Sequence, residues 1–341
     1  MTRPLALTIG EPAGIGPDIT LTAWCERRRS GLPPFYVVAD PGFVAARAER
    51  LGLRVPIAAV EPQEAADAFA TALPVVSLGI DTSAAPARPD GSSAATAIGS
   101  IRRAVADVVA GHAAAVVTNP IAKAVLYQAG FTQPGHTEYL ADLAAETTGH
   151  RPHPVMMLWA SELAVVPVTI HVPLRQVFAE LTTPLIVETG RIVARDLTRR
   201  FGIARPRLAV AGLNPHAGED GTLGEEDQTI VAPAVETLRR DGLLVQGPLP
   251  ADTLFHAAAR AGYDAALCMY HDQALIPIKT VAFEHAVNVT LGLPFVRTSP
   301  DHGTAFDIAG TGRAHATSLI AAMRLAARLA KDSAPAPILS A

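Results

Sequence analysis

The chain has 341 residues, of which 49% are hydrophobic and 5% aromatic, with a formal net charge of -4 at pH 7; this length favours one large α/β fold or two lobes. The mildly acidic balance and the lack of a basic block argue against nucleic-acid binding by counterion release. The two cysteines, Cys25 and Cys268, lie far apart without CxxC spacing, so we expect two buried thiols, with no disulfide framework and no cysteine-based zinc site.

Short apolar runs alternate with segments of helical period, which is the pattern of βα units around a largely parallel sheet. No run reaches the roughly 20 apolar residues of a membrane helix, and no export signal precedes the first run, so we expect a cytoplasmic protein. Strands are predicted over residues 5–9, 35–39, 113–117, 155–159, 163–170, 208–213 and 265–270. Helices are predicted over residues 93–111, 121–129, 138–147, 184–201, 225–241, 252–261 and 317–330.

Two glycine-containing segments are candidates for holding an anion. Residues 10–17, Gly-Glu-Pro-Ala-Gly-Ile-Gly-Pro, match neither the GxGxxG spacing nor the Walker loop, so a tight structural turn is the favoured interpretation. Residues 135–138, Gly-His-Thr-Glu, lie at a helix start, where backbone amides, the imidazole of His136 and the hydroxyl of Thr137 suit a small anion. The alternative is an ordinary N-cap formed by Thr137.

Three histidines follow three predicted strands, because His171, His216 and His271 each lie just beyond an apolar run. Ligands of open α/β sheets bind outside the carboxyl ends of the strands, so these side chains can converge on one cleft. Three neutral imidazoles with an open position suit a catalytic divalent metal ion such as Zn²⁺. The alternative is three isolated turn residues, and the spacing leaves open whether the ligands come from one subunit or two.

Further polar residues lie in the second half of the chain. Asp272 follows a histidine and could orient its imidazole, assist a proton transfer, or simply cap a helix. Lys279, Asn288 and Arg297 lie in apolar or turn-rich surroundings, and lysine and arginine are natural partners of phosphate or carboxylate. Residues 299–312 form a long Gly-rich loop whose polar side chains suit the wrapping of a ligand.

Six motifs between residues 10 and 312 resemble those of the 4-hydroxythreonine-4-phosphate dehydrogenase family, which acts in pyridoxal phosphate (vitamin B6) biosynthesis. They are Gly10-Glu-Pro-Ala-Gly-Ile-Gly-Pro, Thr118-Asn-Pro-Ile, Gly135-His-Thr-Glu, Asn214-Pro-His-Ala-Gly-Glu, Tyr270-His-Asp-Gln and Asp301-His-Gly-Thr-Ala-Phe-Asp-Ile-Ala-Gly. Each is weak alone, but together they are specific and span nearly the whole chain. The family also includes dehydrogenases of four-carbon phosphosugar acids and of aromatic dihydrodiols.

The resemblance implies a fold similar to isocitrate and isopropylmalate dehydrogenases, with two α/β/α lobes, a central cleft and a homodimer. We place the first lobe at residues 1–130 plus 290–341, and the second, with the metal ligands and dimer contacts, at residues 131–289. The resemblance also implies one divalent ion per site (zinc, magnesium or cobalt), held by His171, His216 and His271 and shared between subunits.

The same resemblance implies which residues contact the small molecules. Substrate would contact His136, Thr137, Lys279, Asn288 and Arg297. The adenosine side of NAD or NADP would contact the 301–312 loop through His302, Gly303, Thr304 and Asp307, which explains a nicotinamide enzyme without GxGxxG.

The resemblance therefore implies a metal-dependent, NAD(P)-dependent oxidation of 4-phosphooxy-L-threonine with decarboxylation to 3-amino-2-oxopropyl phosphate. The catalytic residues would be Lys279, which anchors an anionic group together with Arg297, and Asp252 or Asp272, which would assist proton movement. The alternatives are a related dehydrogenase of 4-phosphoerythronate or threonate 4-phosphate, a three-histidine metallohydrolase, and a metal- or anion-binding protein without turnover. Dependence on a nicotinamide cofactor separates the dehydrogenases from the other two.

Overall fold

The computed structural model describes residues 3–133 and 135–332, and the chain divides into two compact units. The first unit contains the residues up to His153 together with Leu293–Lys331, and the second unit is Pro154–Gly292. The chain thus leaves the first unit and returns to it. The crossings lie after residues 153 and 292, so the first one comes later than the expected position near 130.

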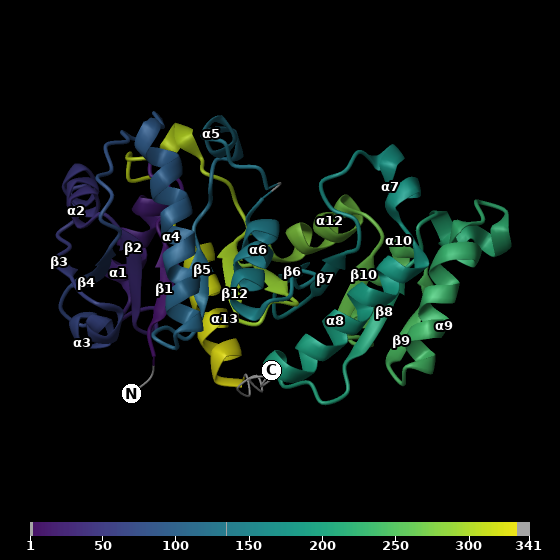
Figure 1. Cartoon of the computed structure of the whole chain (residues 1–341). Helices are drawn as coiled ribbons and strands as arrows, with labels where there is room; N and C mark the ends of the chain where they lie inside the picture. Colours follow the sequence, from purple (N-terminus) through teal and green to yellow (C-terminus); the bar gives the residue numbers. More distant parts are fainter. Residues whose placement is uncertain (1–2, 134, 333–341) are drawn as a thin grey trace. The chain divides into compact units, whose positions relative to one another are not determined.

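A parallel sheet with strand order β3-β4-β2-β1-β5-β12 forms the centre of the first unit (Figure 1). Its strands are β1 (Leu5–Thr8), β2 (Phe35–Ala39), β3 (Ile57–Ala59), β4 (Leu73–Ser77), β5 (Val116–Thr118) and β12 (Arg297–Pro300). Leu7 pairs with Val37 on one side and Val117 on the other, and all three side chains are fully buried. Such apolar runs are typical of parallel strands covered on both faces.

The first unit has seven helices among the described residues, and α4 lies across β1, β2 and β5 (Figure 1). They are α1 (Gly16–Glu26), α2 (Pro41–Arg50), α3 (Ala65–Ala68), α4 (Gly91–Val109), α5 (Lys123–Gln128), α6 (His136–Thr148) and α13 (Thr317–Asp332), with 3-10 turns at Pro62–Glu64 (η1) and Phe306–Ile308 (η4). The helix predicted over 93–111 is confirmed as α4; its Ile101 and Val105 are buried, whereas Val109 is 45% exposed.

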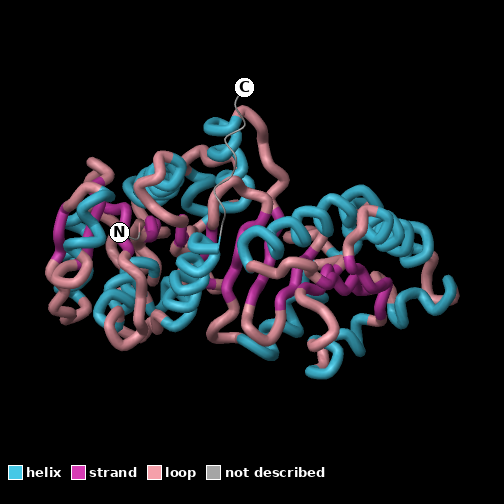
Figure 2. Tube along the Cα trace, turned by 90° about the horizontal axis from the view of Figure 1, so that it is seen from below, coloured by secondary structure: helices cyan, strands magenta, loops and turns pink. Residues whose placement is uncertain are grey.

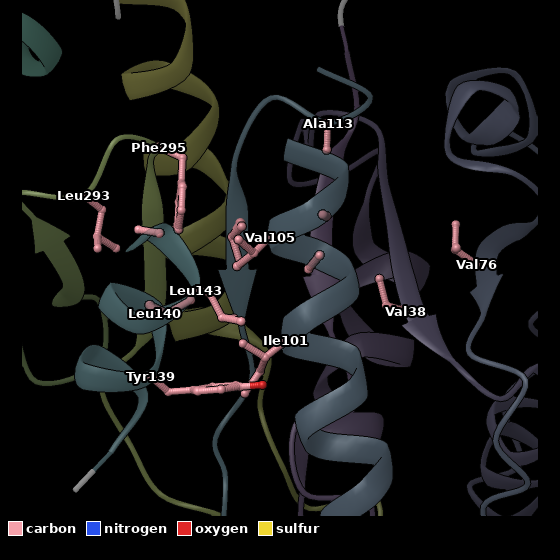
Figure 3. Close-up of a cluster of buried hydrophobic side chains, with 14 of the residues drawn as sticks. Val38, Val76, Ile101, Val105, Ala113, Tyr139, Leu140, Leu143, Leu293 and Phe295 are labelled. Carbon is pink, nitrogen blue, oxygen red and sulfur yellow. The ribbon is translucent and has the colours of Figure 1, made fainter. Parts of the chain in front are cut away.

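The contact between α4 and α6 explains the late first crossing. Ile101 and Val105 of α4 share a buried cluster with Leu140 and Leu143 of α6, and Phe295 from the returning segment completes it (Figure 3). Burial of several large apolar side chains stabilises this contact by removing them from water. Helix α6 therefore belongs to the first unit, and the chain crosses only after it ends.

The second unit contains a mixed sheet with strand order β11-β6-β7-β10-β8-β9. Its strands are β6 (Val155–Trp159), β7 (Ala164–Pro167), β8 (Arg207–Ala211), β9 (Leu244–Leu249), β10 (Ala265–Cys268) and β11 (Val287–Leu291). Strand β6 runs antiparallel to both β11 and β7, whereas β7, β10, β8 and β9 are parallel. The three predicted histidine-bearing strands are therefore the adjacent parallel strands β7, β10 and β8, whose carboxyl ends share one edge.

The helices of the second unit differ in two places from the predicted ones. They are α7 (Leu174–Glu180), α8 (Thr183–Phe201), α9 (Ala232–Arg240), α10 (Ala251–Leu254), α11 (Ala257–Arg260) and α12 (His271–Ala282), with a 3-10 turn at Pro215–Gly221 (η2) and a π-helical turn at Asp227–Val231 (η3). The helix predicted over 225–241 begins as this π-helical turn. The helix predicted over 252–261 is two short helices, because the extended backbone of His256 interrupts it and caps α11.

Figure 2 shows how helices and strands alternate along the described chain. The two cysteines differ in burial. Cys268 is buried as predicted, and burial raises the pKa of its thiol. The prediction of a second buried thiol is wrong, because Cys25 near the end of α1 is exposed. Among the described residues, no helix combines the length and apolar character needed to cross a membrane.

Candidate functional site

One polar cluster lies in the first unit, where β5 and β12 run side by side. The guanidinium of Arg297, at the start of β12, donates to the Oγ1 of Thr118 from Nη2 at 2.6 Å and from Nε at 3.2 Å. Arg297 is only 3% exposed, and burial lowers its pKa to about 10, so it remains a cation at neutral pH. A buried cation of this kind needs an anionic or strongly polar partner.

The N-terminus of α6 forms the second part of this cluster. Gly135 is the N-cap and offers no side-chain cap, so the first amides of the helix remain available for an anion. The expected alternative, that Thr137 caps the helix, is wrong, because Thr137 is its second residue. His136 is the first residue, and its Nε2 is covered without a hydrogen-bond partner among the described residues.

His136 and the two cations beside it are electrostatically coupled. Burial, Arg297 and Lys123 together hold the pKa of the imidazole well below its ordinary value, so the ring is neutral at physiological pH. Sequence reasoning missed Lys123, whose Nζ lies 3.5 Å from the position that a Cβ on Gly135 would occupy. The signal for it was the position of Lys123 just after the Thr118-Asn-Pro-Ile motif at a strand end.

The loop after β1 packs tightly against this cluster. Cβ atoms built on Gly10 and Gly16 would lie 2.5 Å from the carbonyl oxygens of Pro120 and Ile9, and Gly10 has a φ of +74°. The amide of Asn119 donates to Thr8 O at 2.9 Å and fixes the end of β5. These glycines serve close backbone packing, as the interpretation of a tight structural turn predicted.

The proposed cofactor loop lies beside the same turn. Ile15 N donates to Thr304 O at 2.9 Å, and Ala305 has a left-handed φ of +42°. Asp18, paired with the buried guanidinium of Arg47, accepts a hydrogen bond from Gly310 N at the end of the loop. The structure thus anchors the loop through its backbone and leaves the side chains of His302 and Asp307, with Gly303, exposed.

The second unit carries a separate cluster, built on His171 and His271. His171 follows β7, His271 is the first residue of α12 after β10, and their ring centroids lie 5.6 Å apart. Thr169 Oγ1 donates to Met269 O at 2.7 Å and ties the two strand ends together. The rings border a cavity of about 280 Å³ lined by Thr169, Ile170, His171, Val172, Leu174, Val177, Tyr270, His271 and Asp272.

The two histidines fit one divalent metal ion. An imidazole nitrogen lies about 2.1 Å from Zn²⁺, so two rings bound tetrahedrally have centroids roughly 5 Å apart, close to the observed separation. Asp272 Oδ1 lies 2.7 Å from Nδ1 of His271, so Nε2 is the ring nitrogen that remains for a metal. Asp272 is not the N-cap, because Tyr270 holds that position. His171 has a φ of +42°, a strained conformation often found at functional sites.

His216 follows β8, and within the described chain no group of three His, Cys, Asp or Glu side chains is arranged to hold a metal. His216 begins six successive residues with positive φ, 216–221, of which Gly218 and Gly221 are glycines. This conformation costs roughly 1–2 kcal/mol at each other residue. The carboxylate of Asp227 holds the turn by accepting from Leu213 N at 2.7 Å and Asn214 N at 2.9 Å.

The remaining predicted site residues also lie in the second unit. Asp252 is exposed on α10, which contacts the η2 turn that carries His216. Lys279 is half-buried on α12, with its Nζ 5.4 Å from the ring centroid of Phe283. Asn288 is half-buried on β11, opposite Leu158 of β6.

Comparisons with known proteins identify relatives along nearly the whole chain. A family model described as "PdxA: Pyridoxal phosphate biosynthetic protein PdxA" matches residues 32–326. A 4-hydroxythreonine-4-phosphate dehydrogenase of Bradyrhizobium diazoefficiens is 65% identical over 96% of this chain and 97% of that protein. The crystal structure of the Klebsiella pneumoniae enzyme of that name is 38% identical, with a TM-score of 0.84 over 97% of this chain and 98% of the other. A terephthalate 1,2-cis-dihydrodioldehydrogenase from Burkholderia xenovorans is 27% identical, with a TM-score of 0.63 over 96% and 98%.

Proposed function

Because this chain belongs to the PdxA family of 4-hydroxythreonine-4-phosphate dehydrogenases, which act in pyridoxal phosphate biosynthesis, we propose a specific reaction for it. The substrate is 4-phosphooxy-L-threonine, NAD or NADP accepts the hydride, and decarboxylation yields 3-amino-2-oxopropyl phosphate. The observation that carries the proposal is the set of groups suited to a phosphate in the first unit, Arg297, His136 and the open N-terminus of α6. The cytoplasmic location stays a prediction.

The first unit would bind the phosphoryl group. The buried guanidinium of Arg297 supplies a fixed positive charge, and the α6 amides add hydrogen-bond donors aligned with the positive end of the helix. A neutral His136 can donate one hydrogen bond without competing for the negative charge. Thr137, half-buried on the first turn of α6, adds a hydroxyl.

The second unit would hold the divalent ion, which is zinc, magnesium or cobalt, through His171 and His271. When bound, such an ion acidifies the substrate hydroxyl and stabilises the negative charge left on that oxygen as CO₂ departs. Asp272 orients His271 by their 2.7 Å contact, and Asp252 or Asp272 would accept the hydroxyl proton. Lys279 and Asn288 would contact the amino-acid part of the substrate.

His216 would complete the metal site of a second copy in a homodimer. Within the described chain no three His, Cys, Asp or Glu side chains are arranged to hold a metal, which supports a site completed by a partner. Exposed apolar side chains near the histidine pair also support a dimer interface. On α7, Leu174 is 62% exposed and Phe178 is 52% exposed. Ile276 on α12 is 65% exposed, and Phe283, the C-cap of that helix, is 74% exposed. Apolar clusters of this kind mark protein interfaces.

The nicotinamide cofactor would lie against the 301–312 loop. The adenosine part of the cofactor would contact four residues of this loop, the exposed His302, Gly303 and Asp307 and the half-buried Thr304. The anchors at Ile15 and Asp18 keep this loop in place before the cofactor binds, which reduces the entropy lost on binding.

The test is NADH formation with 4-phosphooxy-L-threonine, NAD⁺ and added Zn²⁺, Mg²⁺ or Co²⁺, with 4-phosphoerythronate assayed in parallel. We expect metal-dependent turnover that prefers the threonine compound and is lost on chelation. A preference for erythronate would move the enzyme to a four-carbon phosphosugar acid. Turnover of neither compound, together with hydrolysis of a phosphoester, would replace the dehydrogenase by a three-histidine metallohydrolase.

A further inference from the structure

Positive groups converge on the N-terminus of α6 in greater number than the predicted site explains. Arg297 is a buried cation, the helix end carries a partial positive charge, and Lys123 approaches from α5. Like charges held close together repel one another, so an anion bound among them would relieve that repulsion.

The position of Lys123 follows from the space around Gly135. A Cβ on Gly135 would lie 3.4 Å from Cε and 3.5 Å from Nζ of Lys123. The side chain therefore runs alongside the N-cap of α6, with its ammonium near the open amides. The carboxylate of Glu138 lies 3.3 Å from the same point and is a counter-charge on this side.

The segment that leads to Lys123 is rigidly held. Asn119 Nδ2 donates to Thr8 O and to Thr20 Oγ1 at 2.9 and 2.8 Å, and Pro120 O accepts from Glu11 N at 2.8 Å. Lys123 begins α5 only three residues after Pro120. The ammonium is thus carried by a fixed base rather than by a free loop, which lowers the entropic cost of binding a ligand there.

We propose that Lys123 is a further substrate-binding residue, which pairs with the phosphoryl group opposite Arg297 and selects dianionic phosphomonoesters over acids without phosphate. This inference rests on the proposed function and adds a specificity residue to it. Two cations and the helix amides offer more favourable charge contacts to a dianion than to a single carboxylate. Lys123 would bind ground state and transition state alike, so its effect belongs on KM.

The sequence makes a direct test possible, because it contains only three lysines, Lys123, Lys279 and Lys331. Reductive ¹³C-methylation keeps their charges and gives one NMR signal for each, assigned with Lys→Arg variants. On titration with inorganic phosphate we expect the Lys123 signal to shift together with the ring signals of His136, while Lys331 stays fixed. A shift of His136 without one of Lys123 would overturn the proposal and leave the phosphate site intact.

Kinetics supply the second readout. Lys123→Met should raise KM for the phosphorylated substrate about 10-fold to 100-fold with little change in kcat, because one charge-assisted hydrogen bond is lost. Lys123→Arg should recover most of that loss, and Lys331→Met serves as the control. An unchanged KM in Lys123→Met overturns the role of Lys123. If the wild type turns over no phosphorylated acid, the proposed function fails, and the phosphate titration still decides whether Lys123 binds the anion.

Discussion

At the residue scale, the charge state of His136 depends on what surrounds it. Burial and the cations Arg297 and Lys123 oppose its protonation, so the folded chain holds the ring neutral where an unfolded chain would begin to protonate it. The neutral ring is a hydrogen-bond donor that adds no third full charge to the cluster. Its protonation therefore links folding to pH.

This linkage predicts a loss of stability in acid. The pKa of His136 in the folded chain lies below its ordinary value of 6.5. The unfolding free energy is therefore undiminished above pH 6.5 and decreases as the pH falls toward the folded pKa, because the unfolded chain binds the proton more tightly. In urea unfolding curves, the wild type should lose unfolding free energy relative to His136→Asn as the pH falls below 6.5. Parallel pH curves for the two proteins would contradict this.

Asp272 gives a prediction about metal affinity. Its carboxylate contacts Nδ1 of His271 at 2.7 Å, so Asp272→Asn should weaken metal binding about 10-fold to 100-fold by removing the charge that orients the ring. The side chain is exposed, so the unfolding free energy should change little. Titration with Zn²⁺ measures the effect, and Glu284→Gln, an exposed carboxylate just beyond α12, is the matched control. Equal affinities in both variants would remove Asp272 from the metal site.

Individual site residues were predictable only where strand topology brings them together. His171 and His271 follow adjacent parallel strands, and the carboxyl ends of such strands share one edge, so their proximity could be predicted. Lys123 lies on a short helix beyond its strand, where periodicity says nothing about direction. The run of positive φ at 216–221 was equally hidden, because four of its six residues are not glycines.

At the scale of elements, the packing of α4 on α6 gives a stability prediction. Ile101 is 1% exposed within the cluster of the first unit (Figure 3), so Ile101→Ala should lower the unfolding free energy by about 2–5 kcal/mol. Val109→Ala on the same helix, at a side chain 45% exposed, should cost less than about 1 kcal/mol. Urea denaturation measures both. Equal losses would show that Ile101 is no more important to the packing of α4 than Val109.

Three of the elements that escaped prediction have a local reason. Helix α12 contains Pro277 in its interior, and because a proline normally indicates a helix boundary, no helix was predicted there beyond a possible cap at Asp272. Strand β3 has three residues, and β9 contains Gly247 and Pro248, residues that are rare inside strands. Long segments with regular periodicity, such as α8 and α13, were predicted to within a few residues.

At the scale of the whole molecule, the proposed dimer predicts which inactive variants can complement each other. His171 and His271 lie together in one unit, so a chain lacking either of them loses its own metal site. If the partner supplies His216, a hybrid of His216→Ala and His271→Ala has one intact site, whereas a hybrid of His171→Ala and His271→Ala has none.

Mixing the first pair with subunit exchange should restore about a quarter of wild-type activity, since half of the dimers are hybrids with one working site each. Mixing the second pair should restore nothing. Mass spectrometry of differently labelled chains confirms the exchange. Recovery in neither mixture would place all ligands within one chain.

The return of the chain to the first unit also sets the order in which the protein can be assembled during synthesis. A ribosome releases Pro154–Gly292 as an uninterrupted segment, while the first unit must wait for Leu293–Lys331, which contain β12 and α13. Arg297 meets Thr118 across 179 positions of the chain, a contact that only a nearly complete polypeptide can make. The groups proposed to bind phosphate therefore come together last in a nascent chain, after the histidine pair of the inserted segment has already emerged.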